Sequence, residues 1–169
     1  RFNEANNEEA GEHFTPRDVV RLMANIIFLP IADDIESGTY LVYDGACGTG
    51  GMLTVAEETL RGLANEHSKE VSIHLFGQES QPETYAISKA DLLLKGEGEE
   101  AENFKNGSTL SQDAFPSRNF DFMLSNPPYG KSWKTDLERM GGKKELKDPR
   151  FIVTHDGDPE FWLVTRSND

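Results

Sequence analysis

The chain reads Tyr40-Leu41-Val42-Tyr43-Asp44-Gly45-Ala46-Cys47-Gly48-Thr49-Gly50-Gly51, a short apolar run followed directly by a glycine-rich turn. The apolar run predicts a buried strand that ends at Asp44, and the residues from about 52 to 65 carry apolar side chains at helical spacing. Glycine has no Cβ, so the N–H groups of such a turn can approach a ligand closely. A plain tight turn would use the same residues. No Lys-Ser/Thr pair follows the glycines, which excludes a Walker loop.

The same alternation of strands and helices continues along the chain. Apolar runs predict strands at 71–76 and 120–125, and a short edge strand at 108–110. Helices are expected from Thr15, as the capping residue, to Pro30 and from Pro82 to Gly96. The acidic segment 97–102 predicts a solvated loop. Alternating strands and helices predict an α/β, Rossmann-like fold, a mostly parallel sheet with flanking helices and with ligands at the carboxyl ends of its strands.

Composition limits the possible functions. The 169 residues carry 17 Lys+Arg against 30 Asp+Glu, a net charge of −13, which argues against nucleic-acid binding by bulk charge but leaves room for a local basic surface. A single cysteine excludes an internal disulfide and favours the reducing cytoplasm. The four histidines have no zinc-ligand spacing, so no metal site is expected. The longest apolar run is too short for a membrane span and no signal peptide is recognisable, so we expect no membrane association.

Polar side chains follow two of the predicted strands. Glu79 is placed to accept both hydroxyls of a ribose, unless it is a solvated loop carboxylate. Asp113 can accept a hydrogen bond from an adenine amino group with Phe115 as a packing face, unless it is an ordinary loop aspartate.

The segment Asn126-Pro127-Pro128-Tyr129 follows the last predicted strand. The two prolines restrict the backbone and leave carbonyl acceptors beside the Asn126 amide. The Tyr129 ring can stack on a planar group. Together these groups are suited to hold a planar amine, and a proline-rich turn alone would not require Asn126 or Tyr129.

These segments, together with Phe14-Thr15-Pro16, occur in the order typical of the amino-DNA methyltransferases. The form Gly-Glu-His-Phe-Thr-Pro-Arg at residues 11–17, ahead of Cys-Gly-Thr-Gly-Gly, resembles the modification subunit of type I restriction-modification systems. Gly45 departs from this pattern, because the family usually has proline there. The resemblance implies that further strands, a preceding helical region and a target-recognition domain lie outside the sequence, so the fold is expected to be incomplete at its C-terminal side.

The resemblance implies binding of S-adenosyl-L-methionine. The segment that packs around its methionine portion would be Glu12, His13, Phe14, Thr15, Pro16 and Arg17. Its amino-acid end and ribose would meet Asp44, Gly48, Thr49, Gly50 and Gly51. Glu79 would hold the ribose hydroxyls and Asp113 the cofactor adenine. Residues 1–130 would form this cofactor-binding catalytic core, in part, and 131–169 a basic, flexible loop region that leads into the rest of the domain.

The resemblance also implies the reaction, methyl transfer to the N6 amino group of adenine in DNA. Asn126 and the Pro127 carbonyl would bind that amino group, and Tyr129 would stack on the adenine after it is flipped out of the double-stranded DNA. The specificity and restriction subunits of a type I system would be partners, and this sequence by itself is expected to be inactive if the missing strands are required. Methylation of cytosine C5 is excluded, because no cysteine follows residue 120. A protein glutamine N-methyltransferase and a non-catalytic cofactor-binding scaffold subunit remain the alternatives.

Overall fold

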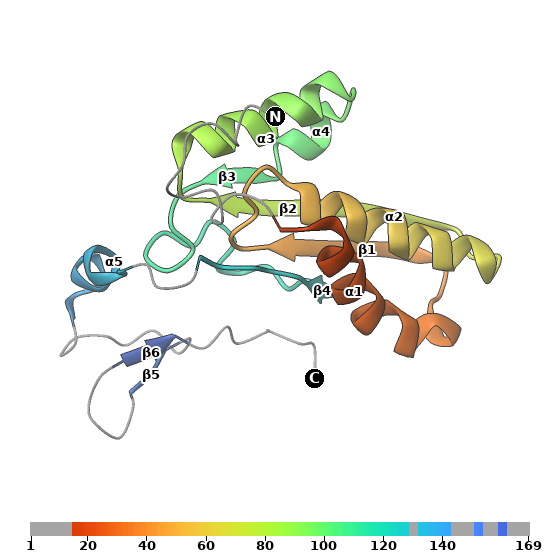
Figure 1. Ribbon diagram of the computed structural model, residues 1–169, viewed down its shortest axis with the longest axis horizontal. Helices are drawn as coiled ribbons and strands as arrows, with labels where there is room; N and C mark the ends of the chain where they lie inside the picture. The colour runs from red at the N-terminus through yellow and green to blue at the C-terminus, as the bar shows by residue number, and fades with distance from the viewer. Residues whose placement is uncertain (1–14, 129–131, 143–150, 154–158, 162–169) are drawn as a thin grey trace.

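The computed structural model describes residues 15–128 and 132–142 and the backbone of two short strands at 151–153 and 159–161. Its main sheet is parallel, with the strand order β3-β2-β1-β4 (Figure 1). The strands are β1 (Gly38–Asp44), β2 (Val71–Glu79), β3 (Phe104–Asn106) and β4 (Phe122–Met123). The helices are α1 (Arg17–Phe28), the 3₁₀ helix η1 (Leu29–Asp34), α2 (Gly51–Glu66), α3 (Pro82–Leu94), α4 (Gly98–Ala101) and α5 (Lys134–Arg139). Strands β5 (Phe151–Val153) and β6 (Pro159–Phe161) pair antiparallel.

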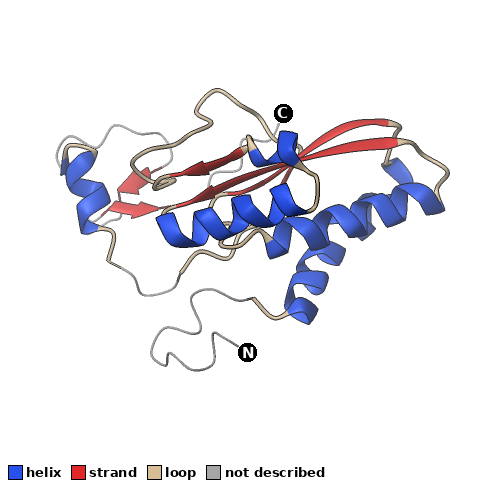
Figure 2. Cartoon of the chain, turned by 90° about the horizontal axis from the view of Figure 1, so that it is seen from above, coloured by secondary structure: helices blue, strands red, loops and turns tan. Residues whose placement is uncertain are grey.

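Helices α1, α2 and α3 cover one face of the sheet (Figure 2). Their buried side chains, such as Phe28, Leu53 and Leu60, pack against Val42, Leu75 and other inward-facing strand residues in one apolar core. The long apolar stripe of α2 explains why this helix lies over β1 and β2, because burial of apolar area is the main favourable contribution to folding. The predicted α/β fold with a parallel sheet is therefore confirmed.

The opposite face of the sheet carries a cluster of aromatic rings. Tyr43 of β1 and Phe76 of β2 are register partners, and Phe115 and Phe120 from the connection between β3 and β4 pack on them. The Tyr43 and Phe120 rings stack with centroids 4.5 Å apart. The connection between β3 and β4, which carries Phe115 and Phe120, thus covers this face in place of a crossover helix.

Two strand predictions were wrong in position. Strand β2 does not stop at residue 76 but continues to Glu79, because Gly77 is a strand residue rather than a turn residue. A Cβ on Gly77 would lie 2.7 Å from the Phe104 ring and 2.9 Å from the Cys47 sulfur, so the glycine permits close packing. The edge strand lies at Phe104–Asn106, whereas 108–110 contain no strand and 109–111 form a turn.

Two local predictions also need correction. Pro16, not Thr15, is the N-cap residue of α1, and no side chain caps that helix. The acidic segment 97–102 contains the short helix α4 rather than a solvated loop. Its residue Glu100 accepts hydrogen bonds from the Leu75 N–H at 2.9 Å and from His74 at 2.8 Å, so it satisfies the exposed edge of β2.

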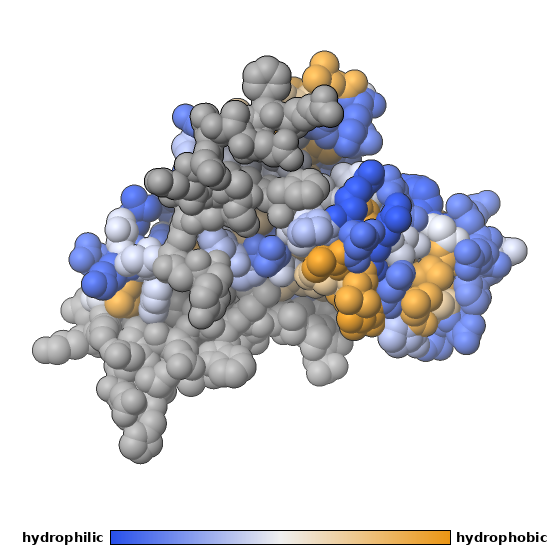
Figure 3. Space-filling view, in the orientation of Figure 1, coloured by the Kyte–Doolittle hydropathy of each residue, from blue (hydrophilic) through white to orange (hydrophobic). Residues whose placement is uncertain are grey.

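The division into 1–130 and 131–169 remains a prediction, and the described residues of the second part include the helix α5. An apolar patch lies on the surface of α1 and the start of η1, where Val19, Leu22, Ile26 and Leu29 are exposed (Figure 3). Among the described residues, no helix has the length and hydropathy to cross a membrane, and no group of acidic, histidine or cysteine side chains is arranged to hold a metal ion.

Candidate active site

The candidate site lies at the carboxyl ends of β1, β2 and β4. The chain passes from β1 to β2 and β3 on one side and then returns to place β4 on the other side of β1. Such a reversal of strand order leaves a crevice at the carboxyl ends of the two strands, where ligands bind in open α/β sheets. The glycine turn follows β1, Glu79 ends β2, and Asn126 comes three residues after β4.

The glycine turn is held by backbone hydrogen bonds. The Cys47 N–H donates to the Gln78 carbonyl at 3.1 Å, and the Gly50 N–H donates to the Cys47 carbonyl at 2.8 Å. Gly48 and Gly50 have φ values of +55° and +84°, a region that disfavours residues with a Cβ. Within the described part of the chain, no atom other than those of the adjoining residues lies within 4 Å of the position that a Cβ would take on Gly48 or Gly51. The backbone of the turn is therefore open to a ligand on that side.

Gly45 is packed more tightly than the rest of the turn. A Cβ there would lie 3.1 Å from the Thr109 methyl group and 3.2 Å from the Tyr43 hydroxyl oxygen. The Thr109 hydroxyl donates a hydrogen bond to the Gly45 carbonyl. Gly45, which departs from the pattern of the family, is thus closely packed by Tyr43 of β1 and by Thr109 of the loop after β3.

Glu79 connects the end of β2 to the glycine turn. Its Oε2 accepts the Gly48 N–H at 3.0 Å, and its Oε1 accepts the Gln81 N–H at 2.7 Å and the Ser80 hydroxyl at 3.3 Å. A carboxylate offers about four acceptor positions. These three contacts leave one acceptor position free on Oε2. A second free position arises only if the 3.3 Å hydrogen bond from the Ser80 hydroxyl to Oε1 is displaced.

Asp44 is a buried carboxyl group beneath the turn, with 1% of its surface exposed. Its Oδ1 accepts the Ala46 N–H at 2.9 Å. Burial, together with the nearby charge of Glu79, raises the pKa of Asp44 from 3.8 to about 6, although hydrogen bonds from Ala46 and Ser125 partly oppose this. An unmatched carboxylate in such a place is an attractive partner for a cation.

Asn126 contacts the start of α1. Its Nδ2 donates a hydrogen bond to Thr15 Oγ1 at 3.0 Å, which leaves the amide Oδ1 as an acceptor. Thr15 therefore holds the Asn126 side chain, a role that differs from the predicted helix cap.

One cavity of about 560 Å³ brings most of the described site residues together. Its lining includes Thr15, Arg17, Asp44, Gly48, Thr49, Gly51 and Asn126. Pro16, Gly50, Glu79, Asp113, Pro127 and Pro128 are described but do not line it, and Glu79 reaches it through its bond to Gly48. Glu12, His13, Phe14 and Tyr129 lie outside the described residues. The roles predicted for all these residues remain predictions.

Sequence reasoning missed one wall of this cavity. Ile87, Asp91 and Lys95 of α3 and the turn after it line the cavity, and the last two form an ion pair of 2.7 Å. The i, i+4 spacing of Asp91 and Lys95 is a recognisable signal for a surface ion pair, but no sequence signal places it beside the glycine turn.

Asp113 lies in the loop after β3. Its Oδ1 accepts the Phe115 N–H at 2.9 Å, so the carboxylate is held by its own backbone. The Phe115 ring does not lie beside an adenine position but packs with Tyr43 and Phe76 on the far face of the sheet. The predicted use of Phe115 as an adenine packing face is therefore not supported by this geometry.

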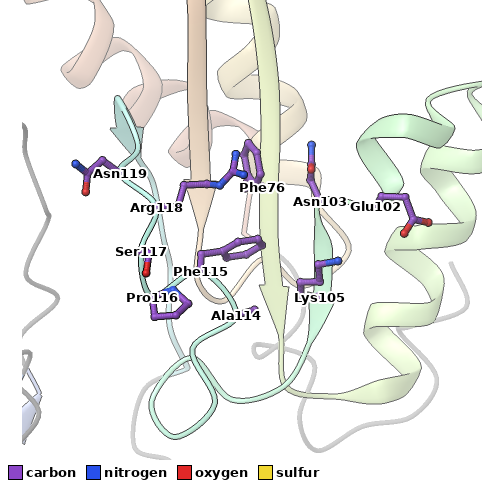
Figure 4. A pocket seen from close by; sticks show the side chains of 10 residues that line it. All are labelled: Phe76, Glu102, Asn103, Lys105, Ala114, Phe115, Pro116, Ser117, Arg118 and Asn119. Atoms are coloured by element: carbon purple, nitrogen blue, oxygen red, sulfur yellow. The ribbon is translucent and has the colours of Figure 1, made fainter.

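A second cavity, of about 680 Å³, lies on the aromatic face of the sheet (Figure 4). Phe76 and Phe115 line it, and the Arg118 guanidinium lies 4.6 Å from the centre of the Phe76 ring. Asp113 and the other described site residues are not among its lining residues. We therefore treat this second cavity as separate from the candidate site.

Cys47 lies against the turn but is not a nucleophile. It is buried, and burial with the charges of Asp44 and Glu79 raises the pKa of its thiol. The thiol therefore stays protonated at neutral pH.

A parallel sheet of this order, with a glycine turn after its first strand and Asn-Pro-Pro after the adjacent β4, defines a Rossmann-like α/β domain, the fold of the solved methyltransferase structures described below. The chain belongs to the N-6 DNA Methylase family, whose model matches residues 1–160.

Several known proteins are similar to this chain. The methylase subunit of the type I restriction enzyme MjaIX from Methanocaldococcus jannaschii is 28% identical over 154 residues, 90% of this chain and 24% of that protein. The corresponding MpnII subunit from Mycoplasma pneumoniae is 30% identical and matches 76% of this chain and 23% of that protein.

Solved structures agree with the fold. The methyltransferase subunit of a type I restriction-modification system from Streptococcus thermophilus has a TM-score of 0.60 at 30% identity, and the match covers 81% of this chain and 26% of that one. A protein from Listeria monocytogenes, assigned to the class I S-adenosylmethionine-dependent methyltransferases, shares the fold at 16% identity with a TM-score of 0.56; the match covers 94% of this chain and 42% of that one. The chain spans about a quarter of the length of these type I relatives.

Proposed function

We propose that this chain is the cofactor-binding and catalytic part of an adenine-N6 DNA methyltransferase, the methylase subunit of a type I restriction-modification system. One observation carries the proposal: Asn126 lines the same cavity as the glycine turn and Asp44. A group that can bind a planar amine is thus next to groups that can bind a nucleoside with an amino-acid tail. Membership of the N-6 DNA Methylase family supports the same reading.

The described residues fit S-adenosylmethionine. The described residues leave open space beside the Cα atoms of Gly48 and Gly51, so the turn can take a ligand against its backbone. The buried carboxylate of Asp44 is suited to the positively charged amino group of the cofactor's amino-acid end. Glu79 has acceptor capacity for ribose hydroxyls at the end of the neighbouring strand. When bound, the cofactor supplies an electrophilic methyl group on a sulfonium.

Asn126 would prepare the target amine for attack. The adenine amine is a weak nucleophile because its lone pair is delocalised into the ring. An acceptor such as Asn126 Oδ1, together with the Pro127 carbonyl, would bind the amine hydrogens and favour a pyramidal nitrogen whose lone pair is directed at the methyl group. These contacts strengthen as the nitrogen gains positive charge, so they lower the barrier rather than only tighten binding.

The DNA substrate and the partners follow from the type I relatives. We propose double-stranded DNA with the target adenine flipped out and stacked on Tyr129, and assembly with specificity and restriction subunits. Residues 131–150 carry seven basic and four acidic side chains, and these basic groups are suited to contact phosphates. We expect base recognition to come from the specificity subunit.

The alternatives are less well supported. A protein glutamine methyltransferase would use the same Asn-Pro-Pro-Tyr, but the family is the N-6 DNA Methylase family and the relatives are methylase subunits of type I restriction enzymes. A non-catalytic scaffold subunit would not require Asn126 held in the cofactor cavity by Thr15.

Transfer of labelled methyl groups tests the proposal. The full-length protein, assembled with its specificity subunit, is incubated with labelled S-adenosylmethionine and either duplex DNA or a glutamine-containing peptide. We expect label on adenine N6 in DNA, and its loss in Asn126→Ala with little change in cofactor affinity. Label on the peptide alone would favour the glutamine enzyme, and cofactor binding without transfer to either would favour the scaffold.

A further inference from the structure

The second cavity, on the aromatic face of the sheet, combines two basic side chains with aromatic rings. Lys105 and Arg118 line it together with Phe76 and Phe115 (Figure 4). Among the described residues, it shares none of its lining with the cavity that contains Asn126. Its volume of about 680 Å³ is in the range of small-molecule sites in proteins.

A tight turn fixes the arginine of this cavity. The Arg118 N–H donates to the Phe115 carbonyl at 3.1 Å, and Pro116 occupies the second position of this four-residue turn, where proline is favoured. The Arg118 guanidinium lies over the Phe76 ring, 4.6 Å from its centre. A guanidinium carries five N–H donors, so contact with a ring leaves several of them available for an acceptor such as a phosphate oxygen.

Lys105 reaches the same cavity from the edge strand β3. The preceding residue, Phe104, is buried in the apolar core under the helices, so strand alternation directs Lys105 to the opposite, aromatic face. In the described part of the chain, neither Lys105 nor Arg118 forms an ion pair with a carboxylate. The one carboxylate that lines the cavity, that of Glu102, is paired with Lys89 at 3.3 Å. The cavity is thus locally positive in a chain whose net charge is −13.

We propose that this cavity binds a nucleotide unit, with its phosphate on Lys105 and Arg118 and its base against the Phe115 ring. The Phe115 ring is half-buried, and its T-shaped contacts with Phe76 and Phe120 hold it in place. A base would therefore stack on a ring that is already ordered. Arginine can bind a phosphate through two parallel hydrogen bonds, whereas lysine acts as a point charge. Such a site goes beyond methyl transfer, because none of these residues lines the cavity of the candidate active site.

Two sources supply this chemistry, a free mononucleotide and a nucleotide within a single DNA strand. Both present one phosphate beside one unpaired base. A strand would add the charge and the bases of neighbouring nucleotides, so it would bind more tightly than a mononucleotide and lose affinity more steeply as salt is added.

Calorimetric titration of the full-length protein with thymine ligands tests the site. Thymidine, thymidine 5′-monophosphate and a thymidine oligonucleotide are compared in the presence of saturating S-adenosylhomocysteine. These ligands contain no adenine, so they match neither the base of the cofactor nor the proposed methylation target. We expect the monophosphate to bind about tenfold or more tightly than thymidine, because its phosphate accepts charge-assisted hydrogen bonds. An oligonucleotide that binds about tenfold more tightly still would identify a DNA strand as the source, and one that binds equally would identify the free nucleotide.

Matched variants separate this cavity from bulk charge. Arg118→Gln should weaken binding of thymidine 5′-monophosphate by about tenfold, and Lys105→Gln by roughly 3–10-fold. Arg61→Gln is the control, because it removes the same charge from α2, where Arg61 pairs with Glu57. Its affinity should match that of wild type.

Equal losses in Arg118→Gln and Arg61→Gln would overturn the proposed site, as would equal binding of thymidine and its monophosphate, or binding of none of the thymine ligands. If Arg118→Gln does not fold by thermal unfolding, Lys105→Gln gives the same comparison. A wild-type protein that fails to bind S-adenosylhomocysteine but binds the monophosphate would contradict the proposed function and support the nucleotide site.

Discussion

The amide nitrogen of Asn126 donates a hydrogen bond to the hydroxyl oxygen of Thr15 at 3.0 Å, across 111 residues of chain. Thr15 precedes α1 and Asn126 follows β4, so this bond joins the first described segment to the end of the strand beside β1. It also determines which side of the amide is free, because with Nδ2 used on Thr15 the Oδ1 remains as an acceptor. Thr15 thereby acts on the group proposed to bind the target amine.

Removal of the Thr15 hydroxyl should slow methyl transfer. In Thr15→Val the Asn126 amide loses its partner and can rotate, so we expect the single-turnover rate at saturating cofactor to fall by roughly 3–10-fold, the effect of about one neutral hydrogen bond. Thr15→Ser keeps the hydroxyl and should stay near the wild-type rate. Asn126→Ala should fall by roughly 10²-fold or more. A Thr15→Val enzyme as fast as wild type would show that this bond does not orient Asn126.

Removal of the Glu79 carboxylate should weaken cofactor binding. Glu79→Ala loses both the ribose acceptors and the bond to Gly48, and we expect a loss of about 1.5–3 kcal/mol in binding free energy. Ser80→Ala is the matched control, because it removes only the 3.3 Å bond to Oε1 and frees an acceptor position. Its affinity should not fall. Calorimetric titration measures both, and an unchanged dissociation constant in Glu79→Ala would contradict the ribose role.

The buried Asp44 should make stability depend on pH. Its pKa is raised from 3.8 to about 6 on folding, so between these values the folded state binds more protons than the unfolded state. The free energy of unfolding should therefore decrease as pH rises from about 4 to 6, by up to about 3 kcal/mol, and change no further from this group above pH 6. Asp44→Asn should be more stable than wild type at pH 7 and equal to it below pH 4. Urea unfolding measures the free energy of unfolding of wild type and of Asp44→Asn across this pH range. A difference between the two that did not change with pH would disprove the assignment.

The same carboxyl group should make cofactor binding depend on pH in the opposite sense. The cofactor's positive amino group favours ionised Asp44, so affinity should rise by up to about tenfold per pH unit below the pKa of about 6 and level off above it. Asp44→Asn should bind weakly at every pH. Titrations between pH 5 and 7.5 measure this, and a pH-independent affinity in wild type would exclude Asp44 as the partner of that group.

Gly77 should tolerate no side chain. In Gly77→Ala the new Cβ would meet the Phe104 ring at 2.7 Å and the Cys47 sulfur at 2.9 Å, and we expect a loss of stability of about 1–3 kcal/mol. Gly62→Ala in α2 is the control, because no atom lies within 4 Å of its Cβ position, and it should stabilise the helix by about 0.5–1 kcal/mol. Thermal unfolding compares the two variants, and equal effects would refute the packing argument.

The sequence predicted the fold well where local signals agree with tertiary packing. The run before Asp44, the glycine turn and the α2 stripe all indicate one strand–turn–helix unit, and the structure has it. The prediction failed at Gly77. Glycine is typical of turns, but Gly77 is a strand residue here, because it packs closely against Phe104, 27 residues away in the sequence. The order of strands, and hence the meeting of Asp44 and Asn126 in one cavity, was not predicted, because it depends on which strands pair and no local signal carries that.

The residues around the site were harder to predict. Nothing in a linear sequence pairs Thr15 with Asn126 or assigns the Gln78 amide to a loop some thirty residues further on. A buried glutamine in an apolar strand is the one signal available for the latter, since such an amide must find partners.

The close packing around Gly45 has a consequence for how this protein can evolve. Proline at this position, the residue usual in the family, brings a Cβ that would meet the Thr109 methyl group at 3.1 Å and the Tyr43 hydroxyl at 3.2 Å. In a lineage that acquired the Gly45→Pro change, the side chains of Thr109 and Tyr43 would have to shift by a few tenths of an ångström, and a larger side chain at position 109 would oppose that shift. The two positions therefore constrain each other's history, and we expect them to covary when sequences close to this one are compared.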